Sequence, residues 1–375
     1  MNIAVNTRLL IRNKLEGIGW FTFESLKRIT TQHPEHHFYF IFDRPYSNEF
    51  IFSENITPIV LYPQARHPLL FYMWFEYSLT SLLKKLQVDL FLSPDGYLSL
   101  KTDVKSLAVI HDLNFEHYPQ DLPYLIRKYY HHYFPKFAAK SHRIATVSEF
   151  SKQDIINLYH IPADRIDVVY DGANEAYEPL SRELIQTVRN KYAGGSPYFI
   201  FIGSIHPRKN LANLFRAFDI FKKRSAANVK LMVVGEKKWW TREINNAFRE
   251  MEHADEVIFT GRLTSEELRL ILGASLALTY VSYFEGFGIP IVEAFRTHIP
   301  VITSNVTSMP EVTGDAGLFV DPLDPESIAE AMIKISADEN LRRELIRKGD
   351  LRKDLFTWQK TADRLWDSIV KAIND

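Results

Sequence analysis

The sequence predicts an α/β fold with two doubly wound, Rossmann-like domains. Short apolar stretches alternate with longer amphipathic stretches along almost the whole chain, and strands that alternate with helices form parallel sheets covered on both faces. The predicted strands fall into two sets of about six, a common size for one sheet, whereas a single sheet of both sets would be unusually large. A flexible Gly-Gly-Ser-Pro break at residues 194–197 separates the two sets.

The strands are read from apolar runs bounded by turn residues. In the first half of the chain they are expected at residues 1–6, 37–42, 57–61, 88–92, 106–110, 143–147 and 166–170. In the second half they are expected at residues 198–203, 229–234, 257–260, 276–281, 300–303 and 317–320. Apolar residues at helical spacing predict helices over Leu211–Arg224, Ser265–Leu272, Pro325–Ala337 and Thr357–Ile373.

The domain boundary is expected between Gly172 and Ser196, where Glu178-Pro179 and the glycine break interrupt the pattern. The N-terminal domain then covers residues 1–172 and the C-terminal domain residues 173–357.

The composition is that of an ordinary globular protein, with 46% hydrophobic and 24% charged residues. A formal net charge of −1 gives no electrostatic argument for nucleic acid as a partner. The absence of cysteine excludes disulfides, thiolate metal sites and thiol nucleophiles. The N-terminus has the pattern of a strand and not of a signal peptide, and no apolar run approaches the ~18 residues that span a bilayer. We therefore expect a cytoplasmic protein.

Ligands of open parallel sheets bind at the carboxyl ends of the strands, so the loops that follow strands are the candidate sites. The first strand leads to Glu16-Gly17-Ile18-Gly19 and a helix that begins near Trp20. Glycines at such a place bring backbone N–H groups close to a phosphate. Thr22 replaces the third glycine of a dinucleotide fingerprint, which argues against NAD. The alternative is a tight turn with no ligand.

His111 directly follows the strand at 106–110 and would face the crevice, where it can donate to a substrate hydroxyl or take part in acid–base chemistry. A buried structural histidine is the alternative. Ser148, after the strand at 143–147, is interpreted as a helix N-cap.

In the second half, the strand at 198–203 ends in Gly203 and is followed by Arg208-Lys209. An adjacent Arg and Lys at the mouth of a parallel sheet form a cationic clamp for a phosphate. Two solvated surface cations are the alternative. Gly261-Arg262, after the strand at 257–260, form a loop placed to hold a base through its backbone groups.

The stretch from Glu285 to Glu293 holds two carboxylates, separated by Gly286, Phe287, Gly288 and Ile289 and then by Pro290. Because proline suits the first position of a helix, Glu285 is expected on a loop and Glu293 in the first helical turn. The N–H groups of a helix start attract phosphate, and carboxylates accept hydrogen bonds from sugar hydroxyls. The implied ligand carries both phosphate and polyol, and a cleft between the domains is its expected place. Glutamates that only complement the helix dipole are the alternative.

These segments, in this order, resemble those of glycosyltransferase family 4, retaining enzymes of the GT-B fold. Gly17-Ile-Gly19 looks like the family's first-loop glycines, Ile110-His111-Asp112 like its His-Asp element, Gly203 to Asn210 like its diphosphate loop, and Glu285 to Glu293 like its E-x7-E signature. Residues 310–312, 314–317, 320–322 and 356–358 also match. The chain departs from the pattern at His298, where a glycine is frequent, and at Glu16.

The resemblance implies a role for each matching residue. Arg208 and Lys209 would neutralise the donor diphosphate, and Glu285 would hold the transferred sugar. Glu293 would accept hydrogen bonds from the ribose, Gly19 would offer its N–H to the phosphate, and His111 would contact the sugar. The donor-binding set is completed by Gly17, Gly203, Arg262, Gly286, Phe287, Gly288 and Ile289. No metal and no other cofactor is implied, and the chain contains no Asp-x-Asp pair. In this fold the two domains face each other across a deep cleft, and the C-terminal helix, residues 358–375, crosses back onto the N-terminal domain.

Residues 122–148 contain no acid, and aromatic residues alternate there with Arg127, Lys128, Lys136 and Lys140. A basic, aromatic segment at 122–143 is typical of contact with an anionic membrane or a lipid-linked acceptor. Pro68–Phe75 would add an apolar patch. The alternative is that the aromatics form core and the cations a solvated face.

The sequence therefore predicts a retaining, metal-independent glycosyltransferase that moves a hexose, with mannose as one candidate, from a GDP- or UDP-linked donor. The acceptor is expected to be a glycan or a lipid-linked glycan in cell-surface polysaccharide or glycolipid synthesis. The enzyme is expected in the cytoplasm, at the inner face of the membrane. The alternatives are a non-catalytic two-lobed nucleotide-sugar-binding protein and a GT-B epimerase or phosphorylase.

Overall fold

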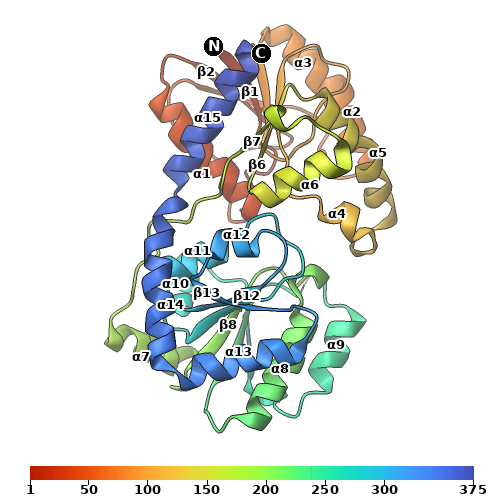
Figure 1. The fold of residues 1–375 in the computed structure, drawn as a ribbon. Helices are drawn as coiled ribbons and strands as arrows, with labels where there is room; N and C mark the ends of the chain where they lie inside the picture. Colours follow the sequence, from red (N-terminus) through yellow and green to blue (C-terminus); the bar gives the residue numbers. More distant parts are fainter. Residues whose placement is uncertain (238) are drawn as a thin grey trace. The chain divides into compact units, whose positions relative to one another are not determined.

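The computed structural model describes residues 1–237 and 239–375, and the chain folds into two compact units (Figure 1). Unit 1 consists of Met1–Gly172 together with Trp358–Asp375, and unit 2 consists of Ala173–Thr357. The chain passes from unit 1 to unit 2 at the beginning of the stretch 172–196, where the sequence placed the boundary.

Unit 1 is built on a parallel sheet of seven strands in the order β3-β2-β1-β4-β5-β6-β7. The strands are β1 (Asn2–Asn6), β2 (His37–Phe42), β3 (Ile56–Val60), β4 (Leu90–Ser93), β5 (Ser106–Val109), β6 (Arg143–Thr146) and β7 (Ile166–Val168). Each overlaps an apolar run that predicted it. The central strands β1, β4 and β5 are almost completely buried, and burial on both faces favours apolar residues throughout a strand. The prediction of a parallel, doubly wound sheet is confirmed for this unit.

Helices cover both faces of this sheet. They are α1 (Gly17–Gln32), α2 (Pro68–Met73), α3 (Thr80–Leu86), α4 (Asn114–His117), α5 (Tyr124–Lys140), α6 (Glu149–Tyr159) and α15 (Trp358–Asn374), with a π-helix, η2 (Trp74–Leu79), between α2 and α3. Helix α15 returns from the far end of the sequence and packs on α1 and on β4, β5 and β6. There the indole of Trp366 stacks on the imidazole of His33 at 3.8 Å.

Helix α1 begins earlier than the sequence predicted. It starts at Gly17, with Glu16 as the extended N-cap residue, and not near Trp20. The two glycines therefore lie in the first helical turn and not in a loop before it. Neither glycine has a positive φ, so the helical conformation is open to both without strain.

Unit 2 is built on a parallel sheet of six strands in the order β10-β9-β8-β11-β12-β13. The strands are β8 (Tyr198–Ile202), β9 (Lys230–Val234), β10 (Val257–Gly261), β11 (Ala277–Tyr280), β12 (Val301–Ser304) and β13 (Gly317–Val320). The helices are α7 (Arg182–Ala193), α8 (Leu211–Arg224), α9 (Arg242–Arg249), α10 (Ser265–Gly273), α11 (Ile289–Arg296), α12 (Met309–Thr313), α13 (Pro325–Ala337) and α14 (Glu339–Arg352). The core is rich in phenylalanine, with Phe199, Phe201, Phe215, Phe218 and Phe221 fully buried.

The strand order of each unit fixes where its loops diverge. In unit 1 the order reverses between β1 and β4, and in unit 2 it reverses between β8 and β11. The loops after such a pair of strands turn to opposite faces of the sheet and leave a crevice at the carboxyl ends, the usual ligand position of this architecture. In unit 2 the two loops carry Arg208-Lys209 and Glu285.

Candidate functional site

The short 3-10 turn Pro207–Lys209 after β8 holds Arg208 and Lys209 in place. His206 precedes the turn, and its Nδ1 accepts a hydrogen bond from the N–H of Arg208 at 3.4 Å. Asn210 ends the turn in a left-handed conformation, with φ 61°. Its side-chain amide donates to the carbonyl oxygens of Val281 at 2.9 Å and Pro322 at 2.6 Å, which ties the turn to the loops after β11 and β13.

Both cations meet Glu285. The guanidinium Nη1 of Arg208 lies 2.6 Å from Glu285 Oε2 and also donates to the carbonyl oxygen of Phe284 at 3.0 Å. Lys209 Nζ forms an ion pair with Glu285 Oε1. Lys209 and Glu285 are only 8% and 5% exposed, so these charges would be costly if they were not paired. Lys209 is buried and Arg208 is partly buried, so the alternative of two solvated surface cations does not describe this pair.

Glu285 stays ionised in this surrounding. Burial by itself would raise the pKa of its carboxyl, but the positive charges of Arg208 and Lys209 outweigh burial and lower the pKa to about 2. Such a carboxylate is a weak base, so its charge, and not its affinity for a proton, is what the site offers to a ligand.

Tyr280, at the end of β11, is a member of this cluster that the sequence did not reveal. Its hydroxyl accepts a hydrogen bond from Lys209 Nζ at 2.6 Å, and the ammonium lies 4.8 Å from the ring centroid. Burial, together with the charges of Glu285 and Glu293, holds the pKa of the Tyr280 phenol well above its usual value. Tyr280 is thus within electrostatic range of both carboxylates of the Glu285–Glu293 stretch. In the sequence it reads as one more apolar residue of a buried strand.

The loop between the two glutamates is fixed by its own packing. Gly288 has φ 106°, and a Cβ there would lie 3.1 Å from the Met309 side chain, so both conformation and space call for glycine. The Ser308 hydroxyl donates to the carbonyl oxygens of Glu285 at 2.9 Å and Phe287 at 3.2 Å. The Phe287 ring is 3% exposed and packs edge-on against Phe356 at 5.3 Å. The Phe287 side chain is therefore packed inside unit 2.

Glu293 lies one residue further into its helix than predicted, at the start of the second turn. Helix α11 begins at Ile289 because Gly288 caps it in a left-handed conformation, so Pro290 is its second residue and Glu293 lies in the second turn. Burial raises the pKa of the Glu293 carboxyl to about 7, against the opposing effect of a hydrogen bond from Tyr177. Tyr177, which is 5% exposed, is a second residue that the sequence analysis missed.

Three glycines line the carboxyl ends of the neighbouring strands β8, β9 and β10. The N–H of Gly203 donates to Val234, and the N–H of Gly235 donates to Gly261, each at 3.0 Å. All three have positive φ, and a Cβ on Gly235 would lie 1.9 Å from the carbonyl oxygen of Gly203. Gly235 was not predicted, although it directly follows a strand as Gly203 does. Arg262 is exposed on the loop after β10, two strands away from β8.

In unit 1, one hydrogen bond determines which ring nitrogen of His111 carries the proton. Its Nε2 lies 2.8 Å from the carbonyl oxygen of Pro94, which can only accept, so Nε2 carries the proton. Burial lowers the pKa of the imidazole, which is therefore neutral with Nδ1 as an acceptor. Nε2 is not available to donate to a substrate, so His111 can offer a substrate hydroxyl an acceptor and not the donor that the sequence suggested.

Gly17 and Gly19 differ in the space around them. A Cβ on Gly17 would meet nothing within 4 Å, whereas one on Gly19 would lie 3.2 Å from the Leu15 side chain and 3.4 Å from the Leu9 carbonyl oxygen. Both belong to the first turn of α1, where N–H groups have no partner within the helix. Ser148 is the N-cap of α6, as predicted, and its hydroxyl accepts from the N–H of Ser151 at 3.0 Å.

The corresponding crevice of unit 1 contains an ion pair that the sequence analysis also missed. Arg8 Nε, after β1, lies 2.7 Å from Asp95 Oδ2, after β4. The guanidinium lies 4.5 Å from the Tyr97 ring centroid and 5.2 Å from that of Phe71. The rule that selected Arg208, a cation in the loop after a central strand, would have found Arg8. Within residues 1–237 and 239–375, no cluster of three or more histidine or carboxylate side chains suits a metal ion.

Comparison with known proteins agrees with this geometry. Residues 17–177 match the family model described as Glycosyltransferase Family 4, and residues 185–352 match that described as Glycosyl transferases group 1. The O-antigen chain mannosyltransferase B of Escherichia coli is 30% identical over 271 residues, which are 71% of this chain and 70% of that protein. The serotype-specific mannosyltransferase WbdA of Escherichia coli is 28% identical over 268 residues, and the chain spans only 32% of its length.

Among solved structures, HepE of Anabaena in complex with UDP and glucose superposes with a TM-score of 0.77 at 14% identity, over 98% of this chain and 99% of that one. Such a likeness extends over both units of the chain and identifies the GT-B fold. The family models and the relatives show which chemistry this fold carries here. The chain belongs to glycosyltransferase family 4, glycosyl transferases group 1, and is a glycosyltransferase with the GT-B fold.

Proposed function

We propose that the enzyme transfers mannose from a nucleoside diphosphate donor to a glycan acceptor, with retention of configuration and without a metal ion. The observation that carries the proposal is the buried cluster of Arg208, Lys209 and Glu285 at the switch point of unit 2. The mannose is supported by the name of the relative O-antigen chain mannosyltransferase B, which covers most of the chain.

Arg208 and Lys209 would bind the donor diphosphate. When the bond between the anomeric carbon and the phosphate oxygen breaks, negative charge collects on the leaving diphosphate, and two preorganised cations stabilise it. In many sugar transferases a divalent metal does this work, and here the cation pair is already in place, which supports the proposal of a metal-independent reaction. Tyr280 would keep the Lys209 ammonium in position through its 2.6 Å hydrogen bond.

Glu285 would stabilise the opposite charge. The sugar ring becomes positive as the diphosphate leaves, and a carboxylate with a pKa near 2 remains negative at any working pH. The same low basicity makes Glu285 a poor general base and a poor covalent nucleophile. The new bond would then form between the acceptor oxygen and the anomeric carbon on the face that the diphosphate leaves, and the acceptor proton would pass to the departing phosphate oxygen.

The remaining residues would orient the donor. Glu293 would accept hydrogen bonds from the ribose, and Gly203, Gly286, Gly288 and Ile289 would present backbone groups to the phosphates. The loop at Gly261-Arg262 would hold the base. In unit 1, His111 would accept a hydrogen bond from a hydroxyl of the sugar, and Gly17 and Gly19 would offer first-turn N–H groups to phosphate.

The acceptor would be a glycan or a lipid-linked glycan of a cell-surface polysaccharide, in line with the O-antigen relative. The enzyme would work in the cytoplasm at the inner face of the membrane. The loop after β10 would select the base of the donor, and the two donor classes to compare are GDP-mannose and UDP-linked sugars.

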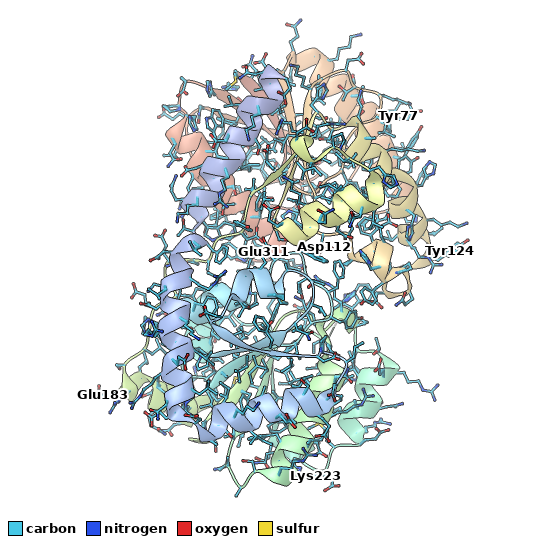
Figure 2. All side chains as sticks on the ribbon, viewed as in Figure 1. Tyr77, Asp112, Tyr124, Glu183, Lys223 and Glu311 are labelled. Atoms are coloured by element: carbon cyan, nitrogen blue, oxygen red, sulfur yellow. The ribbon has the colours of Figure 1, made fainter. Side chains whose placement is uncertain are left out.

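The test is transfer from GDP-mannose and from UDP-sugars to mannose-containing oligosaccharides, in the presence and absence of a chelator. Lys209→Met, which keeps the aliphatic stem, should lose transfer, while Lys223→Met, on the exposed surface of α8 (Figure 2), should keep it. Activity that a chelator abolishes and Mg²⁺ restores would refute the metal-independent reaction. Near-normal turnover of Lys209→Met would refute the site, and an inverted product anomer, detected by NMR, would refute retention.

A further inference from the structure

We propose that one face of unit 1 docks on an anionic lipid bilayer. This α2–α5 face is formed by the exposed apolar side chains of Leu69, Met73, Tyr77, Tyr124 and Leu125 and by the cations Arg127, Lys128, Lys136 and Lys101. It deepens the membrane location that belongs to the proposed function, because it names the residues that would touch the lipid.

The structure separates the aromatic residues of this region into two groups. In α5, Tyr129, Phe134 and Phe137 are at most 6% exposed and belong to the core of unit 1. Tyr124 and Leu125, at the start of the same helix, are 56% and 57% exposed. Segment 122–143 thus gives one face of α5 to the core, while its first turn and the exposed residues His131, His132 and Lys136 lie at the surface.

The same division holds for the segment from α2 into η2. Phe71, Trp74 and Phe75 are buried, whereas Leu69 is 62%, Met73 44% and Tyr77 56% exposed. These three exposed residues follow one another at four-residue spacing, so they form one stripe along the continuous helical segment. Apolar side chains that gather on a surface usually mark an interaction site.

The two groups belong to one continuous surface. Helices α2 and α5 pack together through Phe71 and Tyr129, whose ring centroids are 5.6 Å apart, and through Tyr72 and Tyr133 at 6.3 Å. Lys101 joins the surface with its ammonium 3.8 Å from the Tyr77 ring centroid. Figure 2 shows Tyr77 and Tyr124 projecting from the same side of unit 1.

Cations predominate on this face. Lys128 and Arg127 lie over the Tyr124 ring at 4.6 Å and 5.5 Å, and Lys136 lies over the Tyr133 ring at 5.7 Å. Residues 122–148 contain no acid, and the single acid between 62 and 79 is Glu76, which is 4% exposed and accepts from the N–H of Leu100. Glu116 is paired with His131 at the edge of this face. Within residues 1–237 and 239–375, no ion pair joins a carboxylate to Arg127, Lys128, Lys136 or Lys101, so the charge of these four cations is not neutralised.

Exposed apolar side chains beside cations favour a bilayer with anionic lipids as the partner of this face. Tyrosine and lysine side chains suit the headgroup region, because each has an apolar body and a polar end. A hollow of about 740 Å³ lined by Pro119, Tyr124, Arg127, Lys128, His131 and His132 is wide enough for a phosphate headgroup. Nowhere in residues 1–237 and 239–375 is a helix both long and apolar enough to traverse a membrane.

The test is co-sedimentation of the full chain with vesicles, without any donor or acceptor, so that failure of docking and failure of glycosyl transfer are read separately. Wild-type protein should bind vesicles of equal parts phosphatidylglycerol and phosphatidylcholine, bind pure phosphatidylcholine far more weakly, and be released by salt. Lys128→Ala should lower the partition coefficient about fivefold. Leu125→Ser should lower it about tenfold, since the leucine would be buried in the membrane.

Lys191→Ala is the matched control. Lys191 is an exposed lysine of unit 2 that also lies over a tyrosine ring, that of Tyr192 at 4.6 Å, and its removal should leave vesicle binding unchanged. All variants should retain the wild-type unfolding midpoint and wild-type transfer to a water-soluble acceptor. Equal binding to both kinds of vesicle, or equal binding of Lys128→Ala and Lys191→Ala, would overturn the proposal. Release by inorganic phosphate at an ionic strength at which sodium chloride does not release the protein would also overturn it, because the hollow would then be a site for a single phosphate.

Discussion

Replacing Glu285 by glutamine removes one charge from the centre of the site and changes its size very little. In the wild-type protein this carboxylate neutralises Arg208 and Lys209, which would otherwise lie close together with like charges. The substitution Glu285→Gln leaves both cations without that partner in a buried place. We expect the variant to fold, to be clearly less stable, and to be inactive in transfer.

The expected loss of stability follows from the pKa of the carboxyl. Its value falls from 4.5 to about 2 on folding, and at about 1.4 kcal/mol per pKa unit this corresponds to about 3 kcal/mol. Because the folded pKa is the lower one, the contribution is complete above pH 4.5 and disappears as the pH falls through about 2. The difference between wild type and variant should therefore be about 3 kcal/mol at neutral pH and about 2 kcal/mol near pH 3.5.

The assay is equilibrium unfolding in urea, an uncharged denaturant that does not screen ion pairs, followed by tryptophan fluorescence. Trp240 reports on unit 2, because its indole packs against Phe248 at 6.1 Å. The control is Glu339→Gln, which removes a carboxylate from an exposed pair with Arg343 on α14 and should cost less than about 0.5 kcal/mol. A cost for Glu285→Gln no larger than that of the control, or one that does not shrink in acid, would refute the reasoning.

Three further predictions concern residues near the site. Tyr280→Phe removes the 2.6 Å hydrogen bond to Lys209 and should lower kcat about tenfold in steady-state kinetics, with little change in acceptor KM. An unchanged kcat would exclude a role of Tyr280 in positioning the Lys209 ammonium. Since the pKa of Glu293 is raised to about 7, its carboxylate becomes protonated as the pH falls from 8 to 6, and the donor KM of the wild-type enzyme should rise. In Glu293→Gln the donor KM should not change over that range. A pH dependence like that of the wild type would mean that another group titrates. His298 has φ 57° and its Nε2 lies 3.0 Å from Asp350 Oδ1, so His298→Gly should be about 1 kcal/mol more stable to urea than His298→Ala, and equal stability would contradict the strain.

The sequence predicted the regular elements well because buried parallel strands and amphipathic helices have periodic patterns. Helix α8 and helix α13 begin and end at the predicted residues. The starts of α1 and α11 were wrong, because a helix start depends on the conformation of the cap residue. The left-handed φ of Gly288, for example, cannot be predicted from the sequence, because a glycine is equally compatible with a loop.

The site was predictable where a charged residue follows a strand, as with Arg208 and Glu285, and was missed where the residue is apolar in appearance. Tyr280 and Tyr177 act through single hydroxyl groups in otherwise buried side chains, and the sequence offers no sign of that. The division of α5 into core and exposed residues was left open for a different reason. It depends on the packing of α2 against α5, two segments about fifty residues apart, and such a contact has no local pattern.

The return of α15 to unit 1 has a consequence for how the protein is made. Unit 2 is one uninterrupted stretch of chain, whereas unit 1 is encoded in two pieces separated by all of unit 2. During synthesis the sheet of unit 1 leaves the ribosome first but lacks the helix that packs on α1 and on β4 to β6. Contacts such as the Thr361 hydroxyl donating to the Tyr170 carbonyl oxygen at 2.7 Å can form only after the rest has been translated. The first unit to emerge is thus the last to be completed, and a chain that ended before Trp358 would contain all residues of unit 2 but lack the helix that packs on unit 1.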